Sequence, residues 1–254
     1  MIKVIQIATL SDNYSYIIVD AVSKLNACID PSVSGTIENF LEKNDLILDY
    51  IINTHHHNDH VGGNLELKKK YNCKIIGNLK DQERIPGIDI KLKDNDIFKL
   101  GESEFKVIDT PGHTVGHVCY YFTEDKVLFS GDTLFSMGCG RLFEGSATQM
   151  VKSLKKLRSL PGETKIYCGH EYTQSNAKFA LHLSPRNNKL KEKVIKIEKT
   201  RKKNLSTIPS SIEEEVLLNP FLNFDNSNFI KEIGLENVND YENFRKIRVM
   251  KDEF

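Results

Sequence analysis

One short segment, residues 53–63, constrains the fold and the chemistry of this chain more than any other. It reads Asn-Thr-His-His-His-Asn-Asp-His-Val-Gly-Gly, with four histidines and an aspartate within six residues. Such a cluster suits a packed core poorly, because each imidazole needs hydrogen-bond partners. Alternate side chains of an extended segment face the same side, so His55, His57 and Asp59 should converge, with His60 at the turn into a helix. Imidazole and carboxylate ligands together favour zinc, iron or manganese over calcium.

Three more candidate ligands follow predicted strands. His113 comes after a strand at 104–109, Asp132 after one at 126–131, and His170 after one at 164–169. Rigid scaffolds place their active-site loops at such strand ends. We therefore expect one pocket of three imidazoles and a second pocket that contains Asp59, His60 and His170, with Asp132 bridging them. A carboxylate that holds two metals close together lets them share one water, whose pKa falls toward neutrality.

The pattern of apolar residues predicts an α/β fold. Short runs of β-branched and aromatic residues predict strands at 2–8, 14–20, 26–30, 46–53, 73–77, 104–109, 117–122, 126–131 and 164–169. Helical spacing predicts helices at 34–43 and after a capping box formed by Ser146 and Gln149. The expected architecture is an αββα sandwich over residues 1–172. Residues 173–203 look helical, so residues 173–254 should form a C-terminal α-helical lobe.

Composition excludes several classes of partner. The 35 basic and 35 acidic residues cancel, which predicts neither nucleic-acid nor membrane binding. The first residues carry no secretory pattern, and the five scattered cysteines fit reduced thiols, so we expect a cytoplasmic protein without an obligate protein partner. Residues 186–203 hold nine lysines and arginines against two glutamates. This stretch is read as a solvated helix face, with steering of an anionic substrate as the alternative.

The ligand pattern resembles a known superfamily. HxHxDH at 55–60, followed in order by His113, Asp132 and His170, is similar to the metallo-β-lactamase superfamily. Further stretches resemble the glyoxalase II (hydroxyacylglutathione hydrolase) family over essentially the whole chain: Ser-Asp-Asn-Tyr at 11–14, Cys-Gly-Arg at 139–141, Gly-His-Glu-Tyr-Thr at 169–173, Asn-Pro-Phe at 219–221, and the last residues, 248–254.

This resemblance implies a thioester hydrolase that cleaves S-D-lactoylglutathione to D-lactate and glutathione. It implies two divalent metals, zinc first, with iron or manganese as alternatives, and a bridging hydroxide oriented by Asp59 and Asp132. His55, His57 and His113 would hold one metal, and Asp59, His60 and His170 the other. The implied contacts to the glutathione part are Arg141, Leu142, Phe143, His170, Glu171, Tyr172, Arg248 and Lys251.

Two of these positions depart from the family pattern. Arg141 stands where a lysine is usual, which keeps the positive charge but offers a fork of hydrogen bonds. Phe143 stands where a tyrosine is usual, so one hydroxyl contact to the peptide is expected to be missing. These departures concern substrate affinity rather than the chemistry.

Other readings of the chain remain open. A single-iron persulfide dioxygenase would make less use of Asp59, His60 and His170. A lactonase, β-lactamase or nuclease on the same scaffold is another alternative, and a nuclease would want a larger exposed basic surface than residues 186–203 supply. A non-catalytic binding protein would be expected to have lost ligands. Among the neighbouring residues, His56 and His117 are interpreted as hydrogen-bonding groups, and the cysteines as small buried residues.

Overall fold

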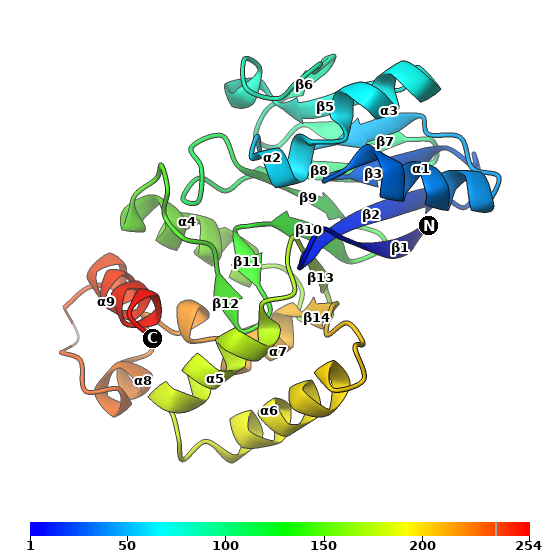
Figure 1. Ribbon diagram of the computed structural model, residues 1–254. Coiled ribbons are helices and arrows are strands. Elements are labelled where there is room, and N and C mark those ends of the chain that lie inside the picture. Colours follow the sequence, from blue (N-terminus) through cyan, green and yellow to red (C-terminus); the bar gives the residue numbers. More distant parts are fainter. Residues whose placement is uncertain (237) are drawn as a thin grey trace.

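The computed structural model describes residues 1–236 and 238–254. Its strands are β1 (Ile2–Thr9), β2 (Asn13–Asp20), β3 (Asn26–Ile29), β4 (Tyr50–Ile52), β5 (Lys74–Asn78), β6 (Ile90–Leu92), β7 (Ile97–Leu100), β8 (Ser103–Asp109), β9 (Val118–Phe122), β10 (Val127–Gly131), β11 (Leu134–Phe135), β12 (Gly138–Cys139), β13 (Lys165–Cys168) and β14 (Ser210–Ser211). In the described residues they form one sheet in the order β1-β2-β3-β4-β5-β6 and another in the order β14-β13-β10-β9-β8-β7, while β11 and β12 pair separately (Figure 1).

Side-chain alternation shows why the two sheets pack face to face. In β2, Tyr16 and Ile18 belong to the core between the sheets, whereas Ile17 belongs to the core on the outer face. In β9, Tyr120 points to the same inner core, and Tyr121 to the outer core of the second sheet. Since neighbouring side chains of a strand leave on opposite faces, strands with apolar residues on both faces require cover on both sides.

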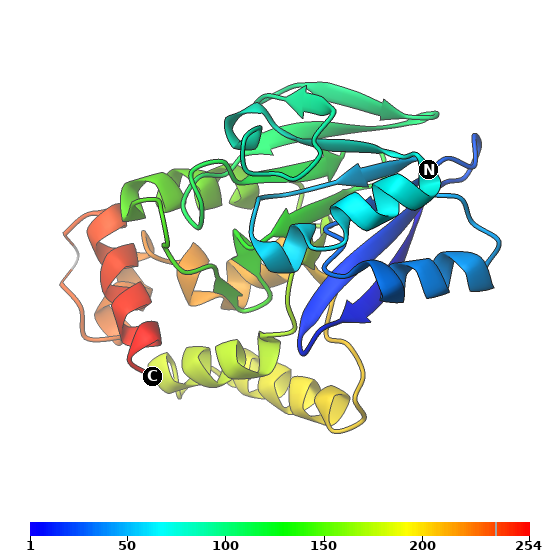
Figure 2. The same cartoon turned by 45° about the horizontal axis from the view of Figure 1, so that its top comes forward.

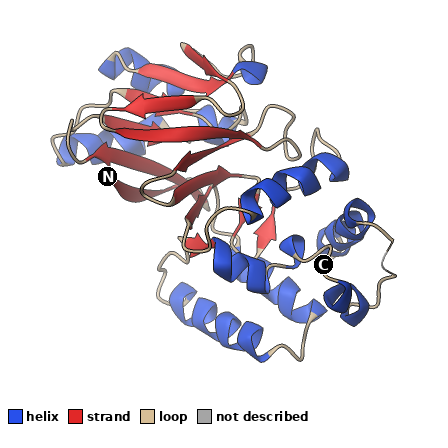
Figure 3. Ribbon diagram, turned by 180° about the vertical axis from the view of Figure 1, so that it is seen from behind, coloured by secondary structure: helices blue, strands red, loops and turns tan. Residues whose placement is uncertain are grey.

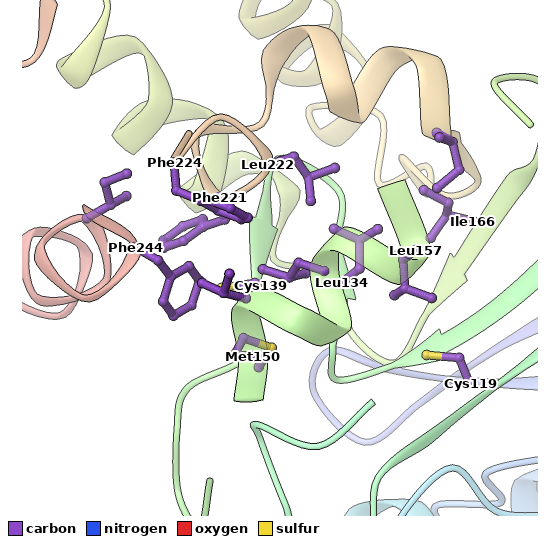
Figure 4. Close-up of a cluster of buried hydrophobic side chains, with 14 of the residues drawn as sticks. Cys119, Leu134, Cys139, Met150, Leu157, Ile166, Phe221, Leu222, Phe224 and Phe244 are labelled. Atoms are coloured by element: carbon purple, nitrogen blue, oxygen red, sulfur yellow. The ribbon is translucent and has the colours of Figure 1, made fainter. Parts of the chain in front are cut away.

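Helices supply that cover. They are α1 (Ser34–Lys43), α2 (Asn58–Val61), α3 (Asn64–Tyr71), α4 (Ala147–Arg158), α5 (Thr173–Leu183), α6 (Asn188–Arg201), α7 (Ile212–Leu218), α8 (Ser227–Glu232) and α9 (Asp240–Asp252), with 3-10 turns η1 (Leu79–Asp81) and η2 (Pro220–Leu222). Helices α1 and α3 lie over the first sheet, as Figure 2 shows, and bury Ile37 and Leu67 there. Helix α4 covers the second sheet with Met150 and Leu157 (Figure 4). The predicted αββα sandwich is confirmed.

The helical lobe predicted after residue 172 is also present. Helices α5 to α9 gather beyond one end of the sandwich, where Figure 3 shows them apart from the strands. The continuous helical stretch expected at 173–203 is instead divided into α5 and α6, because Pro185 cannot donate a backbone hydrogen bond and disfavours helix in the residue before it. Among the described residues, no helix is long and apolar enough to cross a membrane.

Other differences from the sequence expectations are local. The strand expected at 46–53 is shorter, since only Tyr50–Ile52 pair with neighbouring strands. Strands β6, β7, β11, β12 and β14 are two to four residues long, too short to give a periodic signal. The capping box is confirmed: the Ser146 hydroxyl accepts the Gln149 backbone N–H at 3.2 Å at the start of α4.

Candidate metal centre and active site

The predicted ligands gather where strands of both sheets end. His55 and His57 follow β4, Asp132 follows β10, and His170 follows β13. Each is therefore held by a strand of the sandwich but lies beyond its last paired residue. His113 lies four residues after the end of β8 in the same way.

The backbone between His57 and Val61 corrects one step of the sequence argument. Residues 58–61 form the short helix α2, which begins directly after His57. Asp59 therefore does not continue the alternation of His55 and His57 to the same side. Its carboxylate groups with His60 and His170 instead, and the ligand atoms of these three residues lie within 4.8 Å of one another.

The first group consists of three imidazoles around a common point. The Nδ1 atom of His57 lies 3.0 Å from Nε2 of His55 and 3.0 Å from Nε2 of His113. His113 donates its Nδ1–H to the Arg141 carbonyl at 2.9 Å, which leaves a lone pair on Nε2. Burial, together with the neighbouring His113, lowers the pKa of His57 to about 4. These neutral rings offer the nitrogen lone pairs that a divalent metal requires.

The second group combines two imidazoles with the Asp59 carboxylate. Asp59 Oδ2 lies 3.4 Å from Nε2 of His170 and 3.6 Å from Nε2 of His60. The His60 Nε2 atom is buried and has no hydrogen-bond partner among the described residues. A buried polar atom without a partner is costly, and a metal at this point would satisfy it.

Asp132 lies between the two groups. Its Oδ1 atom is 3.5 Å from Nε2 of His60, while Oδ2 is 3.4 Å from Nε2 of His113 and 3.4 Å from Nε2 of His170. In the part of the chain that the structure describes, Oδ1 is also buried without a hydrogen-bond partner. Burial alone would raise the pKa of Asp132, but the charges of His60 and His170 outweigh it and lower the pKa well below its usual value. An ionised carboxylate facing both groups fits a bridging ligand, and each of the two groups could hold a divalent metal.

Residues outside the predicted set orient these ligands. Asp30, at the end of β3, accepts from Nδ1 of His60 at 3.0 Å, and Asp12 accepts from Nδ1 of His170 at 2.8 Å. The Asn13 side chain donates to Asp59 Oδ2 at 2.9 Å. Such partners fix the ring orientation and the tautomer of metal-binding histidines. Asp12 and Asn13 belong to the Ser-Asp-Asn-Tyr stretch at 11–14, so the family resemblance could have identified them from the sequence. For Asp30, the only sequence feature is its position at the end of a predicted strand.

Removing the Asp12 carboxylate should weaken metal binding at the second group. Asp12→Ala leaves Nδ1 of His170 without its acceptor, and loss of such a partner lowers metal affinity by about 10- to 100-fold. Competition with a fluorescent chelator measures the affinity of each metal equivalent. Glu163→Ala is the control, because it removes an exposed carboxylate that pairs only with Lys126 in the described structure. Equal affinities for the two variants would show that Asp12 does not orient His170.

A cavity of about 550 Å³ opens beside the metal centre. This volume lies within the range of small-molecule sites. His113 and Asp132 form its inner end, and five of the predicted substrate contacts lie along it. Those five are Arg141, Phe143, Tyr172, Arg248 and Lys251.

The basic residues of this cavity differ in how available they are. Arg248 is 7% exposed, donates to the Cys139 carbonyl at 3.2 Å and to Asp252 at 2.8 Å, and lies over the Phe221 ring. Lys251 lies within cation–π distance of two rings and contacts the Ser175 hydroxyl at 3.1 Å. Arg141 has a side chain that is 68% exposed. Arg141 and Lys251 are therefore the more available cations for a bound carboxylate.

Aromatic rings connect the cavity to the two metal-ligand groups. The Tyr172 ring stacks on His170 at 4.7 Å between centroids, and Phe143 meets the His113 ring edge-on at 5.1 Å. Phe143 lines the cavity and remains 62% exposed, so much of its ring is available for contact with a bound molecule. Because phenylalanine has no hydroxyl, this position offers an apolar contact only.

Three of the predicted substrate contacts do not line this cavity: His170, which belongs to the second ligand group, and Glu171 and Leu142, which lie elsewhere. The Glu171 carboxylate is buried and accepts hydrogen bonds from Tyr14 at 2.8 Å and from the Thr207 hydroxyl at 2.6 Å. It does not line the cavity, because these partners hold it between the sandwich and the segment after α6. Leu142 packs against the core of the second sheet and faces a neighbouring depression.

The neighbouring histidines and cysteines behave as structural groups. His56 pairs with Asp81 at 3.1 Å, and His117 accepts the Asp132 backbone N–H at 3.0 Å, as expected of hydrogen-bonding residues. The five cysteines are free and buried. Burial raises the pKa of Cys139 to about 11 and that of Cys168 to about 12, so neither thiol is an activated nucleophile.

Comparison with protein families separates the chain into two matched parts. Residues 9–170 match the metallo-beta-lactamase superfamily, and residues 171–254 match the hydroxyacylglutathione hydrolase C-terminus. A hydroxyacylglutathione hydrolase of Methylococcus capsulatus is 47% identical over 254 residues, covering 100% of this chain and 99% of the relative. That of Pelagibacter ubique is 48% identical over 248 residues, covering 98% of each.

Solved structures agree with the architecture. ETHE1 from Myxococcus xanthus has a TM-score of 0.71 at 25% identity, covering 99% of this chain and 91% of that one. TTHA1623 in a di-iron-bound form has a TM-score of 0.62 at 23% identity, covering 87% of this chain and 100% of that one. The second likeness concerns the fold alone. Together with the two family matches and the near-complete coverage of the relatives, these comparisons show that the chain belongs to the hydroxyacylglutathione hydrolase family of the metallo-β-lactamase superfamily.

Proposed function

We propose that this chain hydrolyses S-(2-hydroxyacyl)glutathione, chiefly S-D-lactoylglutathione, to a 2-hydroxy acid and glutathione. One observation carries the proposal: the two adjoining metal-ligand groups lie beside a cavity, and two of its three arginine and lysine residues, Arg248 and Lys251, belong to the part that matches the hydroxyacylglutathione hydrolase C-terminus. Hydrolysis of a glutathione thioester requires two sites, one that activates water and one that binds an anionic peptide. We also propose residues 1–172 as the catalytic unit and 173–254 as the substrate-binding unit.

We assign one divalent metal to His55, His57 and His113 and a second to Asp59, His60 and His170, with Asp132 shared. Zinc is the proposed metal because it suits sites rich in imidazole, and iron or manganese would suit the same ligands. When bound, such metals supply a water of lowered pKa and polarise the thioester carbonyl.

The chain's own residues then orient the reactants. The Asp132 carboxylate lies between the two groups and the Asp59 carboxylate lies within the second group, and both are proposed to orient the attacking water. The attacking water loses one proton to solvent as its oxygen bonds to the carbonyl carbon. The carbon–sulfur bond then breaks, glutathione leaves as a thiolate, and the 2-hydroxy acid releases the remaining proton to solvent. A thiolate is a good leaving group at neutral pH, so protonation of the sulfur by a general acid is not required.

We assign peptide binding to the cavity wall. Arg141 and Lys251 provide charges for a carboxylate of glutathione, and the Tyr172 and Phe143 rings flank the path to the metal centre. Arg248 is proposed to shape this wall, since its guanidinium is already engaged by Cys139. We further propose a cytoplasmic enzyme that acts without nucleic acid, membrane or obligate protein partner. The balanced charge and the free buried cysteines support this.

Loss of Lys251 should weaken the use of peptide substrates selectively. A charge-assisted hydrogen bond contributes roughly 1.5–3 kcal/mol, so Lys251→Ala should raise KM for S-D-lactoylglutathione by about 10- to 100-fold. The rate on a small thioester without the peptide should stay near that of the wild type. Steady-state kinetics on both substrates measure this, with Lys246→Ala on the same helix, outside the cavity, as the control. Equal losses on both substrates would mean that Lys251 supports folding instead.

A further inference from the structure

The strand pair β11–β12 connects the metal centre to the cavity. It begins two residues after Asp132 and ends two residues before Arg141. The Arg141 carbonyl accepts the Nδ1–H of His113 at 2.9 Å. Any shift of this segment therefore moves a hydrogen-bond partner of one metal-binding ring and the cavity wall together.

Side chains of the C-terminal region contact every residue from Phe135 to Cys139 through its backbone. Four residues make these contacts, and they come from α5, α7, the α7–η2 junction and α9. Asn219 donates to Phe135 O (3.3 Å) and Gly138 O (3.0 Å), Asn176 to Ser136 O (3.1 Å) and Arg248 to Cys139 O (3.2 Å), while Glu215 accepts from Met137 N–H (2.7 Å).

Glu215 and Asn219 form the centre of this arrangement. Both side chains are fully buried, and Asn219 Nδ2 donates to Glu215 Oε2 at 2.9 Å across one helical turn. Asn219 Oδ1 accepts the Phe221 backbone N–H at 2.9 Å, which fixes which end of the amide faces the strand pair. Burial raises the pKa of Glu215 to about 7, so placing this carboxyl group here opposes its ionisation. Apolar residues would fill the space without that cost, but they would leave the backbone groups of the strand pair unpaired.

The turn between β11 and β12 needs such support. Met137 has a φ of +61°, a left-handed conformation that disfavours a side chain with a Cβ atom. Gly138 lies so close to the Asn176 amide that any side chain there would overlap it. Conformations of this kind persist only where surrounding contacts hold them, and the Glu215 contact to Met137 N–H is one of these. Figure 4 shows the flanking Leu134 and Cys139 side chains beside Phe221, in the apolar layer that joins this strand pair to the C-terminal region.

We propose that Glu215 and Asn219 are positioning residues. They hold the β11–β12 strand pair so that the metal-binding ring of His113 and the peptide-binding wall at Arg141 keep their relative placement. The inference rests on the proposed function, because it concerns the alignment of thioester and metal centre. Neither residue lines the cavity or belongs to a metal-ligand group.

The test compares two buried asparagines of the C-terminal region. Asn219→Ala removes the contacts to Phe135 and Gly138, whereas Asn243→Ala removes a contact to Phe224 O at 3.0 Å, away from the strand pair. Both residues are fully buried, so both variants lose stability. Asn219→Ala should lower kcat/KM about 100-fold, the effect of a misplacement of about 1 Å. Asn243→Ala should retain wild-type kinetics once folded.

Two readouts on the metal-loaded protein do not depend on turnover. Calorimetry with S-methylglutathione, a thioether that cannot be hydrolysed, should show affinity lowered about tenfold in Asn219→Ala, equivalent to one lost interaction. Amide hydrogen exchange at Met137 should accelerate in that variant and remain slow in Asn243→Ala. Equal behaviour of the two variants in exchange and binding would overturn the proposal.

Glu215 gives a second, shape-conserving test. Glu215→Gln keeps an oxygen that can accept from Met137 and Asn219, and it should restore the kinetics that Glu215→Ala loses. Loss of activity in Glu215→Gln equal to that in Glu215→Ala, with both proteins folded, would contradict a positioning role. If wild-type protein hydrolyses no glutathione thioester, the proposed function fails, and exchange at Met137 still decides whether Glu215 and Asn219 hold the turn.

Discussion

Asp132→Ala should lower kcat/KM for S-D-lactoylglutathione by at least about 1,000-fold. This carboxylate faces His60 with one oxygen and His113 and His170 with the other, so its loss removes a ligand from both groups. Metal activation contributes several kcal/mol to the transition state, and each 1.36 kcal/mol is tenfold in rate. Steady-state kinetics together with elemental analysis of the purified variant measure the effect.

Asp109→Ala is the matched control for Asp132→Ala. Asp109 is likewise a buried aspartate at the end of a strand in the second sheet, but its carboxylate pairs with Lys80. The control should retain two metals per chain and most of its activity. A full complement of metals and near-normal turnover in Asp132→Ala would contradict the bridging role.

Removing the metals should have an effect of similar size. Dialysis of the wild-type enzyme against a strong chelator should reduce the rate by about 1,000-fold or more, because the orienting carboxylates alone cannot lower the pKa of water. Adding back zinc, iron or manganese separately should restore activity and rank the three metals. Circular dichroism before and after dialysis shows whether the sandwich remains folded. Full activity of a folded, metal-free protein would exclude the proposed mechanism.

The sequence predicts the architecture well because two local patterns are strong, the continuous apolar run of a buried strand and the apolar stripe of a helix. Strands such as β2 and β9 carry apolar residues on both faces, and α4 carries a capping box and an apolar stripe. Strands β6, β7, β11, β12 and β14 escape prediction, since their pairing depends on neighbours distant in the chain. Strand β14, for example, pairs with β13 only after α5 and α6 have returned the chain to the sheet.

The grouping of the candidate ligands was predictable because strand ends and histidine spacing are local features. The position of Asp59 was not, since α2 begins immediately after His57 and turns the carboxylate toward His170. The carboxylates that orient the histidines, Asp12 and Asp30, could not be assigned to them from the sequence for a related reason. Asp12 lies 158 positions from His170 in sequence, and only the tertiary fold brings them within 2.8 Å.

The placement of Glu171 shows that a match to a family motif does not by itself establish what a residue contacts. It follows a metal-ligand histidine and belongs to a stretch that resembles a substrate-binding segment, yet its carboxylate holds Tyr14 and Thr207. Adjacent residues near a strand end point to different sides, so one faces the site and the next faces the packed interior.

Product analysis of the purified, metal-loaded protein tests the central claim most directly. With S-D-lactoylglutathione as substrate, free thiol and D-lactate should appear in equal amounts, and an oxygen electrode should record no oxygen consumption. The alternative, a persulfide dioxygenase, would consume oxygen with glutathione persulfide and leave the thioester intact. Thioester hydrolysis without oxygen consumption is the result this account predicts; oxygen consumption on the persulfide with no thiol released from the thioester would contradict it.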